Sequence, residues 1–173
     1  TTILKLDRWS DIMSLTREML EPFGIVIIDT VMAMQEMMIG ELEPKCFNKT
    51  GGLTQQGYGA LSAMAKGFLT KMNSFNLNFN LIFMAHSKEE RNNDNLIIRP
   101  DITGGLKQEL MRKVDFIGYT RIIGDEKNAK YILTFNPYES IMCKNRGGLH
   151  EEIVLDKTPN LLANTITKAI TYM

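Results

Sequence analysis

The sequence has little of what marks secreted or membrane proteins. Its two cysteines are too few for the disulfide framework of a small secreted domain. The longest apolar run, residues 23–28, is far shorter than the roughly 20 residues that a membrane-spanning helix needs. The first seven residues are neither basic nor apolar, so we expect no signal peptide. These absences predict a cytoplasmic protein with no membrane partner.

An excess of either charge is also missing. The 20 Lys and Arg residues balance 20 Asp and Glu residues, giving a formal net charge of zero. This balance excludes a globally basic nucleic-acid coat protein, although it is compatible with a local basic patch. The chain does have 44% hydrophobic and 23% charged residues in 173 positions. That length and composition predict one globular domain with a hydrophobic core.

The order of the predicted elements indicates an α/β protein. Two apolar runs read as buried strands, 25–29 and 78–86; the first is expected to be buried on both faces, which favours a parallel sheet. Apolar residues at spacings of three and four predict a long helix over 55–73 between them. The other predicted elements are helices at 10–20 and 31–38, after Thr103 and after Thr158, strands at 114–123, 131–136 and 140–144, and loops at 40–57 and 87–101. Alternating strands and helices followed by consecutive strands predict a mainly parallel sheet, flanked by helices, with a C-terminal antiparallel extension.

The strands that end at Asp29 and His86 are predicted to be parallel neighbours, with these two polar residues at the same edge of the sheet, where they suit a nucleotide site. Asp29 follows four apolar residues, the arrangement of a Walker B carboxylate, which holds Mg²⁺ through water beside a nucleotide phosphate. His86 ends the second strand, where a polar side chain can sense a terminal phosphate. Plainer alternatives stay open: Asp29 as an acid that ends the strand or caps the next helix, and His86 as an ordinary hydrogen-bonding residue.

A third signal is the basic pair Lys144 and Arg146. One residue separates them in an extended segment, so both side chains leave the same face, just before two glycines. This arrangement suits a group that reaches across a subunit interface, and it also suits a solvated turn. A zinc site is the weakest alternative, because the cysteines and histidines lack the short ligand spacings of zinc proteins. Those residues are Cys46, Cys143, His86 and His150.

Taken in order, these segments resemble the RecA-like recombinase core. Residues 27–34 are similar to its Walker B strand and the turn that follows, and residues 39–57 fall where it has its first DNA-binding loop. Residues 87–105 resemble its second DNA-binding loop, and residues 114–124 resemble the next strand. His86 stands where bacterial recombinases have a phosphate-sensing glutamine. Within the family, the chain is most similar to phage-encoded ATP-binding proteins, some of which act in single-strand annealing and recombination.

The resemblance implies a RecA-like P-loop NTPase core that forms a single ATPase domain over residues 1–173. It implies that Asp29 and Thr30 bind ATP and Mg²⁺, with the metal held by Asp29 through water, and that His86 senses the γ-phosphate. Lys144 and Arg146 are then expected to stabilise charge on a neighbouring subunit's γ-phosphate, in a filament or ring. The residues implied to approach the backbone of single-stranded DNA are Lys45, Lys49, Lys88, Arg91 and Arg99. The implied activity is ATP-dependent DNA recombination, in the host cytoplasm if a phage encodes the chain.

One motif of that family is missing. No Gly-x-x-x-x-Gly-Lys followed by Ser or Thr occurs in the 173 residues. Only 24 residues precede Ile25, too few for a phosphate-loop strand, its helix and the next strand. Because the chain also begins without Met, we expect a preceding segment in the native protein. Two other functions stay open: a non-hydrolysing core that binds DNA or a protein partner, and a phage helicase or helicase loader.

Overall fold

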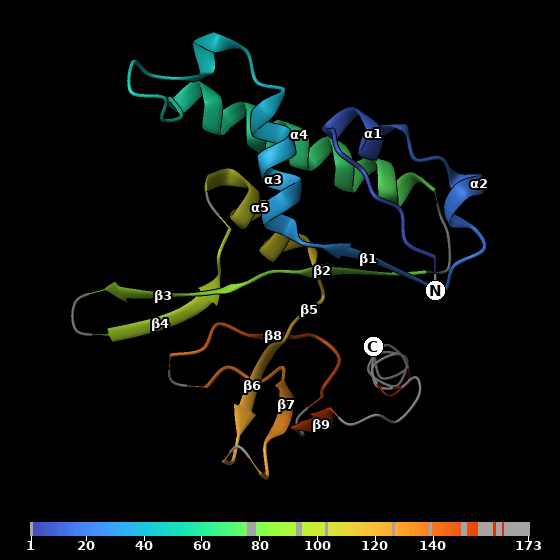
Figure 1. The fold of residues 1–173 in the computed structure, drawn as a ribbon, viewed down its shortest axis with the longest axis vertical. Coiled ribbons are helices and arrows are strands. Elements are labelled where there is room, and N and C mark those ends of the chain that lie inside the picture. Colours follow the sequence, from blue (N-terminus) through green and yellow to red (C-terminus); the bar gives the residue numbers. More distant parts are fainter. Residues whose placement is uncertain are drawn as a thin grey trace. The chain divides into compact units, whose positions relative to one another are not determined.

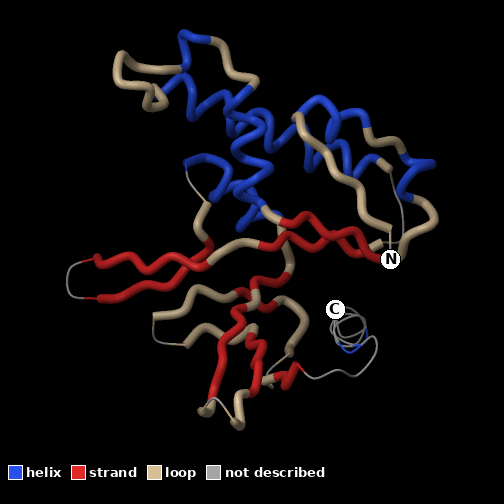
Figure 2. The backbone as a smooth tube through the Cα atoms, viewed as in Figure 1, coloured by secondary structure: helices blue, strands red, loops and turns tan. Residues whose placement is uncertain are grey.

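The computed structural model describes residues 2–75, 79–92, 95–102, 104–125, 127–138, 140–149, 152–155, 161 and 164. The chain divides into two compact units. Unit 1 consists of Thr1–His86 and Asp101–Arg112, and unit 2 consists of Ser87–Pro100 and Lys113–Met173. Helices predominate in unit 1, whereas the described elements of unit 2 are mainly strands (Figure 2). The single ATPase domain predicted over residues 1–173 stays a prediction.

Unit 1 combines helices with two strands (Figure 1). Its elements are α1 (Trp9–Ser14), α2 (Arg17–Leu20), β1 (Ile25–Asp29), α3 (Val31–Gly40), the 3-10 helix η1 (Pro44–Cys46), α4 (Gln55–Ser74), β2 (Asn80–Met84) and α5 (Gly104–Lys113). The single helix predicted over 10–20 is wrong, because Leu15 and Thr16 have ψ angles of 133° and 166°, outside the helical range. Trp9 of α1 and Leu20 of α2 are both buried. Packing of both pieces into the core therefore overrides the continuous helical pattern.

The two strands of unit 1 lie side by side. β1 and β2 pair in parallel, with Ile25 opposite Asn80 and Asp29 opposite Met84. This confirms the predicted neighbouring parallel strands, which the crossover through α3 and α4 connects. Alternate residues of both strands pack against the helical core. The opposite face is open, since Ile27 is 54% exposed, so the predicted burial of β1 on both faces is wrong.

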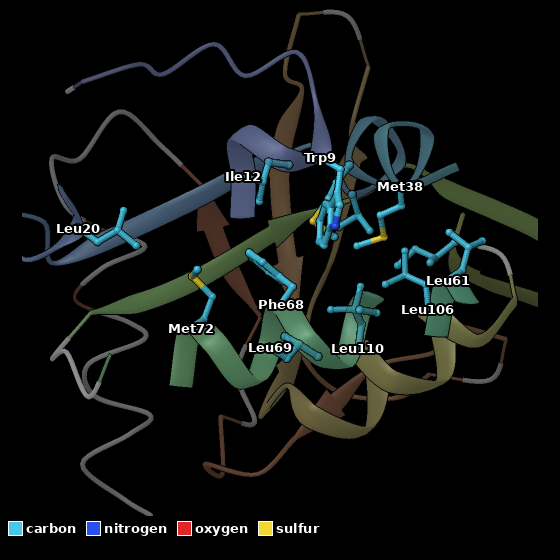
Figure 3. Close-up of a cluster of buried hydrophobic side chains, with 14 residues drawn as sticks. Trp9, Ile12, Leu20, Met38, Leu61, Phe68, Leu69, Met72, Leu106 and Leu110 are labelled. Carbon is cyan, nitrogen blue, oxygen red and sulfur yellow. The ribbon is translucent and has the colours of Figure 1, made fainter. Parts of the chain in front are cut away.

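The hydrophobic core of unit 1 lies between the helices and the covered face of β1 and β2. Figure 3 shows side chains from α1, α3, α4 and α5 meeting in it. Trp9 packs against Phe68 with ring centroids 5.8 Å apart, and Phe68 meets Phe83 edge-on at 6.3 Å. Most buried residues of α4 recur at spacings of three and four. This confirms the amphipathic helix predicted over 55–73.

Hydrogen bonds organise the segment 40–57, which was predicted as a loop. It contains η1 and then turns at Asn48, whose Oδ1 accepts from the backbone N–H groups two and four residues ahead (3.0 and 2.9 Å). Thr54 is the N-cap of α4: its Oγ1 accepts from the Gly57 N–H (3.2 Å) and donates to the Cys46 carbonyl (3.1 Å). The loop is thereby tied to the first turn of α4.

Glycines allow α5 to lie close against α4. A Cβ on Gly104 would come within 2.6 Å of the Tyr58 ring, and a Cβ on Gly105 would come within 2.7 Å of the Ser62 Cβ. Gly104 also has a φ of +60°, a conformation that L side chains rarely adopt. The start of α5 therefore requires both glycines.

One buried carboxylate joins the same two helices. Glu109 of α5 is 9% exposed and pairs with Lys66 of α4 (Oε1–Nζ 3.3 Å) and with Arg112 (Oε2–Nη2 2.9 Å). Burial raises the pKa of this carboxyl, but the hydrogen bonds and the charges of the two cations together lower it by more, so the net pKa lies below that of an ordinary glutamate.

Unit 2 is built from antiparallel strands. β3 (Ser87–Asn92) and β4 (Asn95–Pro100) form a hairpin, so the loop predicted at 87–101 is wrong. The other strands are β5 (Phe116–Ile117), β6 (Tyr119–Ile123), β7 (Lys130–Thr134), β8 (Lys144–Asn145) and β9 (Ile153–Leu155). β5 pairs with β8, and β7 lies between β6 and β9. The strand predicted at 114–123 is divided at Gly118, and of the strand predicted at 140–144 only Lys144 belongs to a strand, β8.

This topology corrects the predicted sheet. Among the strands of the described residues, β1 and β2 are the only parallel pair, so a mainly parallel sheet is wrong. The antiparallel strands predicted in the C-terminal part are present, but they form separate small sheets. The helix predicted after Thr158 lies outside the described residues apart from Leu161 and Asn164, which are helical. Over the described part of the chain, no helix has the length and apolar character needed to cross a membrane.

Candidate functional site

The carboxyl end of β1 carries the first predicted site residue. Asp29 is the last residue of the strand, and its side chain is exposed. The Asp29–Thr30 peptide bond is cis. Thr30 then begins α3, and its Oγ1 accepts from the Ala33 N–H (3.3 Å) as an N-cap. The alternative of Asp29 as a helix cap is therefore wrong, because Thr30 fills that role; a plain strand-ending acid stays open.

His86 lies at the same edge of the sheet as Asp29, as predicted, but beyond the strand. β2 ends at Met84, opposite Asp29, and His86 follows two residues later with an exposed side chain. The strand predicted to reach residue 86 is thus two residues too long. The His86 carbonyl accepts from the Asp101 N–H (2.7 Å). The chain therefore leaves and re-enters unit 1 at adjacent points, before and after the β3–β4 hairpin.

The described residues contain no cluster of side chains that would form a cage around a metal ion. No group of three or more His, Cys, Asp or Glu side chains able to hold a metal occurs among them. The zinc alternative therefore gains no support, and His150 lies outside the described residues. Mg²⁺ keeps several waters and takes one or two carboxylates together with substrate phosphates. An exposed Asp29 at a strand end fits Mg²⁺ held in that way.

The basic pair lies in unit 2: Lys144 is on β8, and Arg146 directly follows that strand. Lys144 is half-buried, and its Nζ donates to the Val114 carbonyl (2.5 Å). Burial lowers the pKa of Lys144, the nearby Arg146 charge lowers it further, and Asp115 opposes both effects. The Arg146 side chain is 51% exposed, and its Nη1 donates to the Asp115 Oδ1 (3.1 Å). Lys144 is therefore not part of a solvated turn, whereas Arg146 reaches the surface.

Sequence reasoning missed two residues beside this pair. Asp115 contacts Arg146, and Asn145 fixes the turn that follows: its side chain donates to the Leu149 carbonyl (2.5 Å) and accepts from the Leu149 N–H (3.2 Å). An Asn two residues before Gly-Gly is a weak turn signal. No signal in the sequence placed Asp115 opposite Arg146, because that contact depends on the pairing of β5 with β8.

Four of the predicted DNA-contacting residues are exposed. Lys45, in unit 1, pairs with Glu43 (Nζ–Oε2 2.7 Å), and the hydrogen bond that it donates to this carboxylate raises the lysine pKa. Lys49 is exposed in the same segment. Lys88 and Arg91 are exposed on β3, in unit 2. The structure thus places these cations on two separate segments.

The fifth, Arg99, is engaged inside the hairpin. Its Nη2 donates to the Glu90 Oε1 (2.7 Å), its Nε contacts the Glu90 Oε2, and its side chain is 9% exposed. Over residues 87–100, three basic and three acidic residues cancel. Those residues are Lys88, Arg91 and Arg99 against Glu89, Glu90 and Asp94. The hairpin therefore has no net positive charge to attract a phosphate backbone.

The comparisons with known proteins give one finding. Neither the curated proteins nor the solved structures include a significant match. A family model described as an AAA domain matches residues 2–147, a range that includes Asp29, Lys144 and Arg146. This match does not confirm the resemblance to RecA-like recombinases or to phage recombination proteins. Because it covers most of the sequence, the chain belongs to the AAA domain family, whose members are nucleotide-binding, ATPase-like proteins.

Proposed function

We propose that this chain supplies part of an ATP-binding site at the carboxyl ends of β1 and β2. The observation that carries the proposal is the exposed Asp29 at the end of a parallel strand pair, in a chain that belongs to the AAA domain family. Ligands of open α/β sheets bind at such strand ends. Asp29 would hold Mg²⁺ through water, and the metal would neutralise charge on the nucleotide phosphates.

His86 is the candidate for sensing a terminal phosphate. Its exposed side chain lies at the same sheet edge as Asp29. Its backbone carbonyl accepts a hydrogen bond from the Asp101 N–H, at the base of the β3–β4 hairpin. A change in the position of His86 would therefore reach β3 directly along the chain. Thr30 contributes by fixing the start of α3 next to Asp29.

The basic pair is the candidate for action on a nucleotide held by another subunit. Arg146 is exposed directly after β8, and Lys144 lies two residues earlier, at the start of that strand. A cation that approaches the γ-phosphate stabilises the charge that develops during phosphoryl transfer. This role requires self-association, in a filament or ring.

We further propose that the protein uses ATP in DNA recombination and that it binds single-stranded DNA. The support is the ordered resemblance of residues 27–146 to recombinase motifs, and the exposed Lys49, Lys88 and Arg91. The β3–β4 hairpin has no net charge, and Arg99 is paired with Glu90. We therefore expect fewer than the five phosphate contacts that the resemblance implies. A second candidate, binding without hydrolysis, is favoured by the absence of a phosphate-loop motif from the 173 residues.

The nucleotide proposal is tested with the protein expressed from its complete reading frame. Asp29→Asn should lower Mg²⁺-dependent ATP hydrolysis at least about tenfold, because an amide binds Mg²⁺-bound water more weakly than a carboxylate. Asp7→Asn is the control, because Asp7 is an exposed acid outside β1. This variant should hydrolyse ATP at the wild-type rate. Wild-type hydrolysis by Asp29→Asn would refute the proposed site, and nucleotide binding without hydrolysis in the wild type would favour the second candidate.

The DNA proposal is tested by the salt dependence of binding. Lys88→Gln with Arg91→Gln should weaken binding to single-stranded DNA of any sequence and reduce the salt slope by about one for each lost phosphate contact. Lys130→Gln, at an exposed position on β7, is the matched control. An unchanged slope in the double variant would remove the hairpin from the DNA-binding site.

A further inference from the structure

Asp115 and Arg146 are cross-strand partners at the end of the β5–β8 pair. Phe116 lies opposite Asn145 and Ile117 lies opposite Lys144, so the next pair in this register is Asp115 with Arg146. The Arg146 N–H donates to the Asp115 carbonyl (3.3 Å), which continues the pairing. Since side chains alternate between faces, Asp115, Arg146 and Lys144 share one face.

The contact with Asp115 uses a small part of the Arg146 guanidinium. Nη1 donates to the Asp115 Oδ1 (3.1 Å), and within the described residues this side chain makes no other hydrogen bond or ion pair. A guanidinium has five N–H donors. The Glu90–Arg99 pair provides the contrast: Glu90 takes both Nε and Nη2, and the Arg99 side chain is 9% exposed, against 51% for Arg146.

Asp115 also offsets the repulsion between the two cations. The Arg146 charge lowers the pKa of Lys144, and Asp115 acts in the opposite direction. The residue before Asp115 takes part as well, because the Val114 carbonyl accepts from the Lys144 Nζ. One short segment, residues 114–115, thus holds both Lys144 and Arg146 in place.

We propose that Asp115 is a positioning residue for Arg146. It holds the guanidinium through one edge and leaves the other donors facing outward, toward a phosphate group on a nucleotide bound by another copy of the chain. This inference rests on the proposed role of the basic pair. A carboxylate that competed with the phosphate would be expected to engage two donors, as Glu90 does on Arg99.

The first test measures the order of the guanidinium in the 173-residue chain. The ¹⁵N relaxation of the Arg146 Nε–H group should show less order in Asp115→Ala, whereas Asp115→Asn, which keeps an acceptor oxygen, should retain it. Glu152→Gln is the matched control: it removes the partner of Arg121 in the same unit (Nη2–Oε1 2.6 Å) and should leave Arg146 unchanged. Equal order of Arg146 in the wild type and Asp115→Ala would overturn the proposal.

The second test measures ATP turnover by the protein from its complete reading frame. Asp115→Ala should lower kcat at least about fivefold with KM for ATP changed less than about twofold, and Asp115→Asn should recover most of the loss. A higher kcat in Asp115→Ala would overturn the proposal, because it would identify Asp115 as a competitor of the phosphate. An equal loss in both variants would also overturn it. If the wild type does not hydrolyse ATP, the proposed hydrolytic role of the basic pair fails, and the relaxation series alone decides whether Asp115 positions Arg146.

Discussion

Gly105 is the residue at which α5 approaches α4 with no room for a side chain. We predict that Gly105→Ala lowers the free energy of unfolding by about 1–3 kcal/mol, because its Cβ would lie 2.7 Å from the Ser62 Cβ. The measurement is urea unfolding followed by the fluorescence of Trp9, the single tryptophan of the chain.

Gly67 provides the control for that variant. It lies within α4, and a Cβ there would meet nothing within 4 Å. Gly67→Ala should raise the free energy of unfolding by about 0.5–1 kcal/mol, because alanine loses less backbone freedom in a helix. If both alanine variants stabilise the chain alike, the close approach at Gly105 does not limit packing.

Glu109 makes stability depend on pH at a single residue. Its pKa is lowered in the folded chain by Arg112 and Lys66, which outweigh burial. A lowered folded pKa gives stability that is fully present above the unfolded pKa and is lost as the pH falls through the folded pKa. We predict that Glu109→Gln lowers the Tm at pH 7 and that its difference from the wild type shrinks below the ordinary pKa of glutamate. Scanning calorimetry across this pH range, with exposed Glu36→Gln as the control, measures the effect; a constant difference would contradict it.

Among single residues, sequence reasoning correctly predicted that Asp29 and His86 lie at one edge of the sheet. It did not identify Asp115. The first two follow apolar runs, and the carboxyl ends of parallel strands meet at one edge of a sheet, so the pattern alone brings them together. Asp115 and the Glu90–Arg99 pair depend on which residues face each other across antiparallel strands. Strand register is set by the whole pairing and is not visible in a short stretch of sequence.

At the scale of elements, Thr54 connects α4 to the segment before it. We predict that Thr54→Ala lowers the free energy of unfolding by about 1 kcal/mol, because it removes the N-cap bond to Gly57 and the bond to the Cys46 carbonyl. Thr54→Ser keeps the hydroxyl and should stay close to the wild type. Urea unfolding with tryptophan fluorescence distinguishes the two variants. Equal losses would mean that the methyl group of Thr54, and not its hydroxyl, stabilises this junction.

Elements with a regular apolar pattern were predicted well, and those without one were not. β1, β2 and α4 bury residues at the spacings that the sequence displays. β3 has no apolar residue, so its sequence gave no sign of a strand; its pairing with the apolar β4 makes it one. The break between α1 and α2 has a similar cause, because packing of Trp9 and Leu20 decides it and the helical spacing continues through it.

At the scale of the whole chain, the family match and the missing motif make a joint prediction. The 173 residues should bind ATP·Mg²⁺ poorly and hydrolyse it negligibly, because they contain no glycine-rich loop whose N–H groups cradle phosphates. Isothermal titration calorimetry of the 173-residue chain should show no binding in the micromolar range. Micromolar binding would mean that other residues of the chain replace the phosphate loop.

The hydrogen bond between the His86 carbonyl and the Asp101 N–H marks a point where the β3–β4 hairpin can be replaced by a shorter segment. With residues 87–100 replaced by Asn-Gly, His86 and Asp101 would become the first and last residues of a β-turn, and the same 2.7 Å bond would close it. Such a shortened chain should keep the Trp9 emission of the original, because every residue of the Trp9 core lies outside the excised stretch. The junction is thus a grafting point, where another hairpin or a labelled peptide can be spliced while the Trp9 core is kept; the replacement removes the two backbone hydrogen bonds that join Ile98 to Ser140 and Met142.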